Sequence, residues 1–175
     1  LQIPLYERMM EAAPPSVRTM IVSGDVYIRA TESIGQIPDA DVICYGLWLG
    51  PDIAKDHGVF VSSRKTPSIL KCMLQKPSVQ TLGELFNEHL YLTDIGLWMF
   101  SDRAVKVLMN RSMRNNNVVN YDMYGEFGCA LGTNPGICDT EINSLRVAVL
   151  PLPGGEFYHF GTSHELLLPH WPFKT

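Results

Sequence analysis

The stretch RTMIVSGDVYI, residues 18–28, decides the fold class that we predict. Its apolar run MIV shows little alternation with polar residues, which suits a strand that is covered on both faces, as in a parallel sheet. Just before it, residues 5–13 place apolar side chains at helical spacing, and two consecutive prolines end that helix. A helix followed directly by a buried strand indicates an α/β fold.

The rest of the chain continues this mixture of helices and strands. Further strands are predicted at residues 40–49, 58–63, 70–77, 91–100 and 145–153, and helices at residues 78–89, 102–113 and 121–132. Ser101 or Asp102 caps the second of these helices. Some consecutive strands are close enough in sequence to pair antiparallel. We therefore predict one α/β domain with a Rossmann-like architecture, in which helices flank a mixed, mainly parallel sheet.

Composition and charge exclude several classes of protein. With 46% hydrophobic and 18% charged residues, the 175-residue chain is neither a disordered tail nor a coiled coil. The net charge of −4 and the lack of a basic run with interleaved aromatics argue against nucleic acid as a main partner. The apolar runs are too short to cross a bilayer, and the N-terminus lacks a signal-peptide pattern. We predict a cytoplasmic protein that does not contact membranes, with four reduced and mostly buried cysteines.

Gly24-Asp25 is the first motif with candidate binding chemistry. A glycine at the end of a buried strand lets a ligand approach, and the carboxylate then lies at the sheet edge where open α/β folds bind ligands. Magnesium prefers one or two carboxylates together with phosphate oxygens, which makes Asp25 a candidate magnesium ligand. A simple turn at Gly24-Asp25 is the alternative interpretation.

The second motif is MLQKPS, residues 73–78, which holds Lys76 between a strand and a proline. Because the backbone is restricted there, the ammonium group can be aimed at a phosphate as a compact charge. Gln75 can both donate to and accept from sugar hydroxyls. The alternative is a lysine that faces solvent at the end of a strand.

The third motif is TDIGLWMF, residues 93–100. Asp94 precedes a buried strand and Gly96 leaves room beside it, which suits recognition of hydroxyl groups by charge-assisted hydrogen bonds. The alternative is that Asp94 caps a turn. Trp98 and Phe100 are expected in the core.

The fourth motif is FYHFGTSHELL, residues 157–167. Thr162 and Glu165 have the spacing of a capping box, so a helix is predicted to begin there with its free N–H groups facing the turn before it. A purely structural cap is the alternative. His159 lies in an aromatic run, a pattern that is typical of a buried histidine as well as of a ligand-binding one.

Taken in order, the segments SGD, HGVFVSSRKTPSILKCMLQKPS, DIGLWMF and GGEFYHFGTSHELL resemble the successive motifs of sugar-1-phosphate nucleotidyltransferases. Those enzymes have Gly-Asp, a Gly-Val-Val strand leading to Glu-Lys-Pro, then Asn-x-Gly-Ile and Trp-x-Asp-x-Gly-Thr. The segments ADVICYGLWL and SDRAVKVLM look like the branch with L-fucose-1-phosphate guanylyltransferase activity. That activity occurs as a separate enzyme, and in some bacteria as the N-terminal part of a protein that also contains an L-fucokinase.

The resemblance implies roles for individual residues. Asp25 matches the aspartate that holds the catalytic magnesium, and Lys76 matches the lysine that meets the sugar phosphate. Asp94 and Gly96 match the Asn-x-Gly that touches sugar hydroxyls. Gly58 matches a glycine whose backbone lies against the sugar.

The chain departs from the family pattern at two of these positions. Gln75 stands where the superfamily has glutamate, and His159 stands where it has a second metal-binding aspartate. Since magnesium favours oxygen ligands, our hypothesis is that His159 gives a hydrogen bond or positive charge to the phosphates instead. Glu156 and Thr162, in the segment GGEFYHFGTSHELL, are further candidate substrate-binding residues.

The resemblance also implies the reaction, in which L-fucose 1-phosphate and GTP give GDP-L-fucose and pyrophosphate with Mg²⁺ as cofactor. The glycine-rich loop that embraces the nucleotide in this superfamily has no counterpart before Gly24. With no initiator methionine, the chain is expected to be a piece of a longer protein, inactive alone, with a possible sugar-kinase domain in the parent. Residues 1–168 would be its sugar-phosphate-binding portion, and residues 169–175 an exit segment toward a following domain. A non-catalytic sugar-phosphate-binding or scaffold module fused to a kinase is the alternative.

Overall fold

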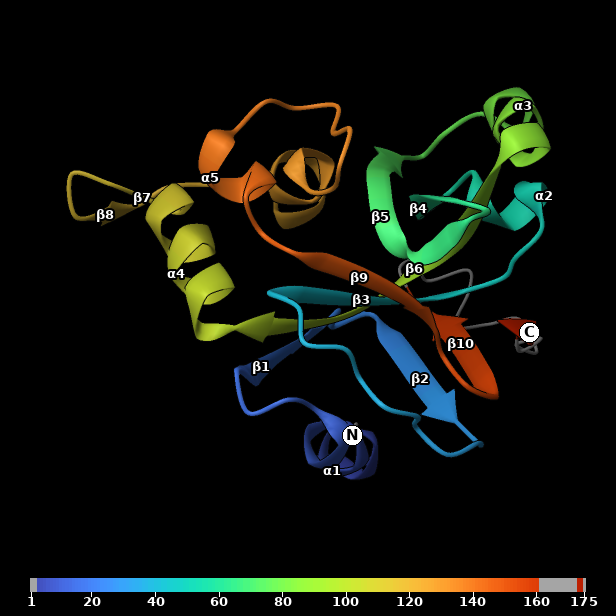
Figure 1. Ribbon diagram of the computed structural model, residues 1–175, viewed down its shortest axis with the longest axis horizontal. Coiled ribbons are helices and arrows are strands. Elements are labelled where there is room, and N and C mark those ends of the chain that lie inside the picture. The colour runs from blue at the N-terminus through green and yellow to red at the C-terminus, as the bar shows by residue number, and fades with distance from the viewer. Residues whose placement is uncertain (1–2, 161–172, 175) are drawn as a thin grey trace.

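The computed structural model describes residues 3–160 and 173–174, which form a mixed α/β fold (Figure 1). The first half contains α1 (Ile3–Ala12), β1 (Val17–Val22), β2 (Val26–Ala30), β3 (Val42–Leu47), α2 (Pro51–Ala54), β4 (Gly58–Ser63), β5 (Thr66–Gln75) and α3 (Val79–Glu88). The second half contains β6 (His89–Ser101), α4 (Asp102–Arg111), β7 (Met113–Arg114), β8 (Asn117–Val118), the π-helical turn η1 (Met123–Phe127), the 3₁₀ turn η2 (Gly128–Ala130), α5 (Thr140–Asn143), β9 (Val147–Pro151), β10 (Gly155–His159) and β11 (Phe173–Lys174).

The central sheet is covered on both faces. Alternate side chains of β3 point to two separate cores, Ile43 and Tyr45 to one and Val42 and Cys44 to the other. The first core also contains side chains of α1, β2 and β10, and the second contains side chains of α4, η1 and η2. Every residue of β3 is therefore buried, and the strand predicted at residues 40–49 is confirmed.

The prediction of a mainly parallel sheet is wrong, whereas the mixed α/β class is confirmed. The central sheet has the order β1-β6-β3-β9-β5-β4, and a further pairing of β4 with β6 closes part of it into a barrel-like ring. Among the pairings in the described residues of this sheet, only that of β3 with β9 is parallel. Burial on both faces is typical of parallel sheets. Here helices and a second, small sheet cover both faces of a mixed, mainly antiparallel sheet.

The stretch at residues 18–28 forms two strands instead of one buried strand. β1 lies at the edge of the central sheet, antiparallel to β6, and its residues after Arg18 are half-buried. β2 belongs to the small sheet with the order β11-β10-β2. The backbone turns at Gly24 and Asp25 between the two strands. For the local backbone, the alternative interpretation of Gly24-Asp25 as a simple turn is therefore correct.

A serine side chain caps the N-terminus of two helices. Ser78 accepts a hydrogen bond from the Thr81 N–H at the start of α3. Ser101 accepts one from the Ala104 N–H at the start of α4, which decides between the two predicted caps. The helix predicted at residues 121–132 is instead the succession of η1 and η2, and the polar run after α4 forms the short β7–β8 hairpin.

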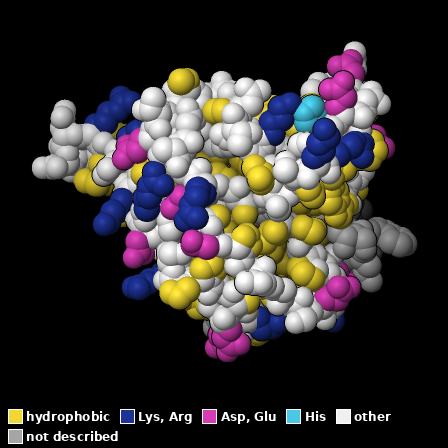
Figure 2. Space-filling view, viewed as in Figure 1, with side chains coloured by type: hydrophobic (Ala, Val, Ile, Leu, Met, Phe, Trp, Pro, Cys, Tyr) yellow, Lys and Arg dark blue, Asp and Glu magenta, His cyan; other side chains and the backbone are white. Residues whose placement is uncertain are grey.

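Positive and negative side chains lie interspersed on the surface shown in Figure 2, in agreement with the small net charge of −4. Figure 2 shows Lys and Arg side chains interspersed with Asp and Glu around an apolar area on one face of the molecule. Arg111 forms a bidentate ion pair with Asp139 at 2.8 and 2.9 Å. The four cysteines have free thiols, but the prediction that they are mostly buried is wrong, because only Cys44 is fully buried, Cys72 and Cys129 are half-buried and Cys138 is exposed. None of the helices that the structure describes is long and apolar enough to cross a membrane.

Candidate functional site

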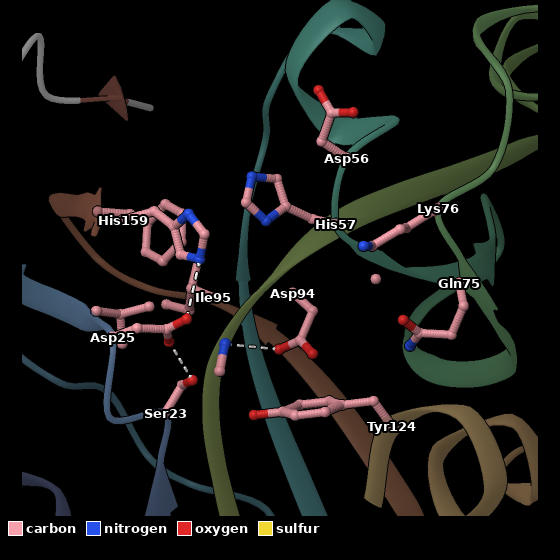
Figure 3. A pocket seen from close by; sticks show the side chains of 14 residues that line it. Ser23, Asp25, Asp56, His57, Gln75, Lys76, Asp94, Ile95, Tyr124 and His159 are labelled. Atoms are coloured by element: carbon pink, nitrogen blue, oxygen red, sulfur yellow. Dashed lines mark hydrogen bonds and ion pairs between the residues drawn. The ribbon is translucent and has the colours of Figure 1, made fainter. Parts of the chain in front are cut away.

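The motifs identified in the sequence meet at one cavity of about 180 Å³ (Figure 3). Its walls come from the β1–β2 loop, the turn before β4, the end of β5, the middle of β6, η1 and the end of β10. The cavity is lined by most of the predicted site residues, namely Asp25, Gly58, Gln75, Lys76, Asp94, Gly96 and His159. Segments that are far apart in the sequence thus contribute to one site.

Asp25 is held by hydrogen bonds at both carboxylate oxygens. The Ser23 hydroxyl donates to Oδ1 at 2.6 Å, and His159 Nε2 lies 3.2 Å from Oδ2. The backbone N–H of Ser23 donates to the Gly96 carbonyl at 2.9 Å, which ties this loop to β6. The hydrogen bond from Ser23, opposed by partial burial, lowers the pKa of Asp25, so this carboxylate is negatively charged at neutral pH.

The donor set around Asp25 is compatible with magnesium only if a substrate supplies further oxygens. No group of three His, Cys, Asp or Glu residues that could hold a metal occurs within residues 3–160 and 173–174. A magnesium ion bound by one carboxylate, by phosphate oxygens and by water is a common arrangement. Asp25 can provide that carboxylate, while His159 lies beside it as a hydrogen-bond partner.

Asp94 is buried at a bulge in β6. Between Leu97 and Asp94 the pairing of β6 with β3 shifts register, and Gly96 there has a φ of 70°. Asp94 Oδ1 accepts hydrogen bonds from the Gly96 N–H at 2.8 Å and from Trp98 Nε1 at 3.0 Å. Asp94 therefore caps this turn and also lines the cavity, so the two interpretations of its role are compatible. Trp98 lies in the core, as predicted.

We expect the Asp94→Asn variant to be more stable than the wild type above pH 6. Burial raises the pKa of Asp94 to about 6, against the lowering effect of the hydrogen bonds from Trp98 and Gly96. Between about pH 4 and 6 the native state thus binds more protons than the unfolded state, and the stability of the wild type falls as the pH rises. Because one pKa unit corresponds to about 1.4 kcal/mol, the loss is on the order of 2–3 kcal/mol.

Urea unfolding of both proteins at about pH 4 and about pH 8 measures this difference. The asparagine keeps an oxygen that can accept the same two hydrogen bonds, so the comparison isolates the charge. A variant that gained no stability over the wild type at the higher pH would show that the hydrogen bonds offset the burial of the carboxylate.

Gly58, Gln75 and Lys76 lie at the open end of the β4–β5 hairpin. Gly58 pairs with Gln75, and a Cβ atom on Gly58 would lie 3.0 Å from Gln75 Nε2 and 3.3 Å from Asp94 Cβ. The next residue, Lys76, has a φ of 45°, which is unusual for a residue other than glycine. Its N–H donates to the His57 carbonyl at 3.0 Å, so the backbone of Lys76 is fixed at the cavity.

We expect Gly96→Ala to destabilise the fold by about 2–3 kcal/mol, since an alanine is strained at positive φ and its Cβ finds no room. That atom would lie 2.7 Å from Ser23 Cβ. Gly24→Ala is the matched control, because a Cβ there meets nothing within 4 Å. Denaturant unfolding of both variants tests the difference, and equal losses would contradict the steric explanation.

One of the predicted residues in the described part of the chain, Glu156, does not line the cavity. Side chains alternate along β10, and those of Phe157 and His159 face the cavity while Glu156 does not line it. Glu156 instead forms an ion pair with Arg29 at 3.5 Å. Thr162 and the predicted helix start lie outside the described residues.

Four of the polar lining residues were not predicted as site residues: Ser23, Asp56, His57 and Tyr124. Ser23 and His57 each begin a segment that carries the resemblance, so their position next to Gly24 and Gly58 was an available signal. Tyr124 comes from η1, far along the chain from the other residues, and its ring packs edge-on against Trp98. Nothing in the local sequence pattern indicates its place at the cavity.

Comparison with known proteins confirms the resemblance to a sugar-1-phosphate nucleotidyltransferase. The chain is 56% identical over 169 residues, or 95% of its length, to a Bacteroides fragilis protein named L-fucokinase/L-fucose-1-P guanylyltransferase. It covers 18% of that relative, or about a fifth of its length. Among solved structures, the crystal structure of mannose-1-phosphate geranyltransferase from Thermus thermophilus has 14% identity and a TM-score of 0.48, over 84% of this chain and 47% of that one. No family model matches the chain.

Proposed function

We propose that this chain forms the sugar-phosphate-binding part of a guanylyltransferase that makes GDP-L-fucose and pyrophosphate from L-fucose 1-phosphate and GTP. The observation that carries the proposal is the meeting of Asp25, Lys76 and Asp94 at one cavity. The sequence similarity to a protein named for this activity supports the choice of substrates. The parent protein would then also contain a sugar kinase.

The chemistry of the reaction suits the groups at the cavity. An oxygen of the sugar phosphate attacks the α-phosphorus of GTP in line, and the bond from that phosphorus to the leaving pyrophosphate breaks. A phosphate monoester is already ionised at neutral pH, so the attack requires orientation rather than a general base. Lys76 would orient the phosphate, and Asp94 would accept hydrogen bonds from sugar hydroxyls.

Asp25 is the residue that we propose as the magnesium ligand. When bound, the ion would neutralise charge on the triphosphate and bring the two anionic substrates together. Ser23 and His159 hold the Asp25 carboxylate in place on either side. In this arrangement His159 also lies close to where the phosphates would gather, which supports its proposed role of giving them a hydrogen bond or positive charge.

The nucleotide-binding half of the site would come from polypeptide outside this sequence. No glycine-rich loop with arginine and lysine precedes Gly24 in the chain. A second candidate is a non-catalytic sugar-phosphate-binding or scaffold module. Both candidates predict binding of sugar phosphate by this chain, and they differ in whether the parent protein turns over GTP.

Calorimetry on this chain tests the proposal, with L-fucose 1-phosphate, other hexose 1-phosphates, inorganic phosphate and GTP as separate ligands. We expect L-fucose 1-phosphate to bind more tightly than the other phosphorylated ligands, and GTP to bind weakly. Tight GTP binding would contradict the proposal that this chain forms only the sugar-phosphate-binding part of the site. Formation of GDP-L-fucose by the parent protein, followed through pyrophosphate release, would decide between the enzyme and the scaffold.

A further inference from the structure

One side of the cavity carries a row of nitrogen-bearing side chains. Figure 3 shows His57 between His159 and Lys76, on the side opposite Tyr124. The rings of His57 and His159 meet edge to face, with centroids 5.4 Å apart and an interplanar angle of 86°. These three side chains come from the turn before β4, the end of β10 and the end of β5.

The position of His57 is fixed by both its backbone and its ring. Its carbonyl accepts the N–H of Lys76 at 3.0 Å, so the two side chains enter the cavity from the same end of the β4–β5 hairpin. Its ring also packs edge-on against Phe157, with centroids 5.6 Å apart. A group that binds the Lys76 ammonium would therefore meet a preorganised imidazole next to it.

The charge of the cavity shows why Lys76 alone does not suit a phosphate. Among the described residues that line the cavity, Lys76 is the only lysine or arginine, whereas Asp25, Asp56 and Asp94 bring carboxyl groups. A phosphate monoester carries close to two negative charges at neutral pH. It needs further donors on the side away from Asp94, and an imidazole provides one N–H when neutral and two when protonated.

We propose that His57 binds the phosphate group of the sugar 1-phosphate together with Lys76 and His159. The sugar hydroxyls then lie on the opposite side, toward Asp94 and Tyr124. This assignment rests on the proposed function, because it takes the cavity to be the sugar-phosphate site. It adds a phosphate ligand that the family motifs do not indicate, and it sets the direction in which the substrate lies.

Two replacements of His57 separate phosphate binding from a structural role. His57→Phe keeps an aromatic ring that can pack against Phe157 and His159, but it removes both ring nitrogens. His57→Gln removes the ring and keeps an N–H donor. We expect His57→Phe to weaken binding of L-fucose 1-phosphate by about 10-fold or more, and His57→Gln to weaken it less. Neither is expected to change the binding of unphosphorylated L-fucose by more than about 2-fold.

Calorimetry of wild type and variants with L-fucose 1-phosphate, L-fucose and inorganic phosphate measures these changes, and thermal unfolding confirms that each variant is folded. His89→Gln is the matched control, because His89 contacts Lys71 and does not line the cavity. A purely structural His57 would give the reverse order, with the phenylalanine variant binding normally. Equal losses for L-fucose and its 1-phosphate would also overturn the proposal.

The proposed function and the role of His57 can fail separately. If the wild type prefers another hexose 1-phosphate, the choice of fucose is wrong and the same variants are compared with that ligand. If the wild type binds L-fucose 1-phosphate and His57→Phe binds it equally well, only the role of His57 is wrong. If no phosphorylated ligand binds to the wild type, both are wrong.

Discussion

Replacing Asp41 with alanine is expected to lower the free energy of unfolding by about 2–4 kcal/mol, because a buried and multiply bonded carboxylate is lost. The side chain lies where three elements meet. It accepts hydrogen bonds from the Ser101 hydroxyl at 3.1 Å, from Arg103 Nη1 at 3.2 Å and from the Arg146 N–H at 2.9 Å. It thereby joins the start of β3 to the start of α4 and to the start of β9.

The matched control is Asp39→Ala. Asp39 also pairs with Arg146, at 3.4 Å, but its side chain is 61% exposed whereas that of Asp41 is 7% exposed. An exposed ion pair contributes about 0–1 kcal/mol, so this variant should remain close to the wild type. Urea unfolding of the two variants at neutral pH measures both values. Equal and small losses would show that solvent replaces the partners of Asp41.

The sequence predicts the elements of this fold better than their pairing. The strand predicted at residues 40–49 is confirmed as β3, which is buried on both faces, but that burial does not set the direction of its neighbours. β3 is antiparallel to β6 on one side and parallel to β9 on the other. Pairing direction depends on contacts between segments far apart in the sequence, which a local pattern does not contain.

The position of β1 at the edge of the sheet shows a second limit of prediction from the sequence. The apolar run that ends at Val22 has the composition of a core strand, yet β1 lies at a sheet edge and is half-buried. The same limit applies to Tyr124, which reaches the cavity only because η1 packs against the β6 bulge through Trp98. The resemblance, by contrast, groups Asp25, Lys76 and Asp94 as one site, because the order of motifs carries information that single motifs lack.

The alternation of side chains along β10 explains why His159 lines the cavity and Glu156 does not. Both belong to the same motif, and both were candidates for substrate contact. Once β10 pairs with β2 over residues 155–159, successive side chains must point to opposite sides. His159 then pairs with Asp25 at the cavity, while Glu156 pairs with Arg29. A sequence-based prediction of a strand at residues 155–159 would have placed Glu156 and His159 on opposite faces of that strand.

Lys76 is the position where the largest loss of binding is expected, together with a gain of stability. The residue holds a φ of 45°, which costs a residue with a side chain about 1–2 kcal/mol. Lys76→Gly relieves this strain, and after the added entropy of glycine in the unfolded chain the expected gain is about 0.5–1 kcal/mol. A side chain held at such a cost is typical of a functional site.

Because the ammonium is the only permanent cation among the described lining residues, its removal should weaken binding of L-fucose 1-phosphate by about 10–100-fold. Lys76→Met is expected to weaken binding equally without the gain in stability, since it keeps a side chain at the strained position. Lys65→Met, in the turn between β4 and β5, is the control for net charge and should change neither quantity. Calorimetry and urea unfolding of the three variants measure both effects. Normal binding by Lys76→Gly would refute phosphate recognition by this lysine, and loss of binding without any gain in stability would refute the strain.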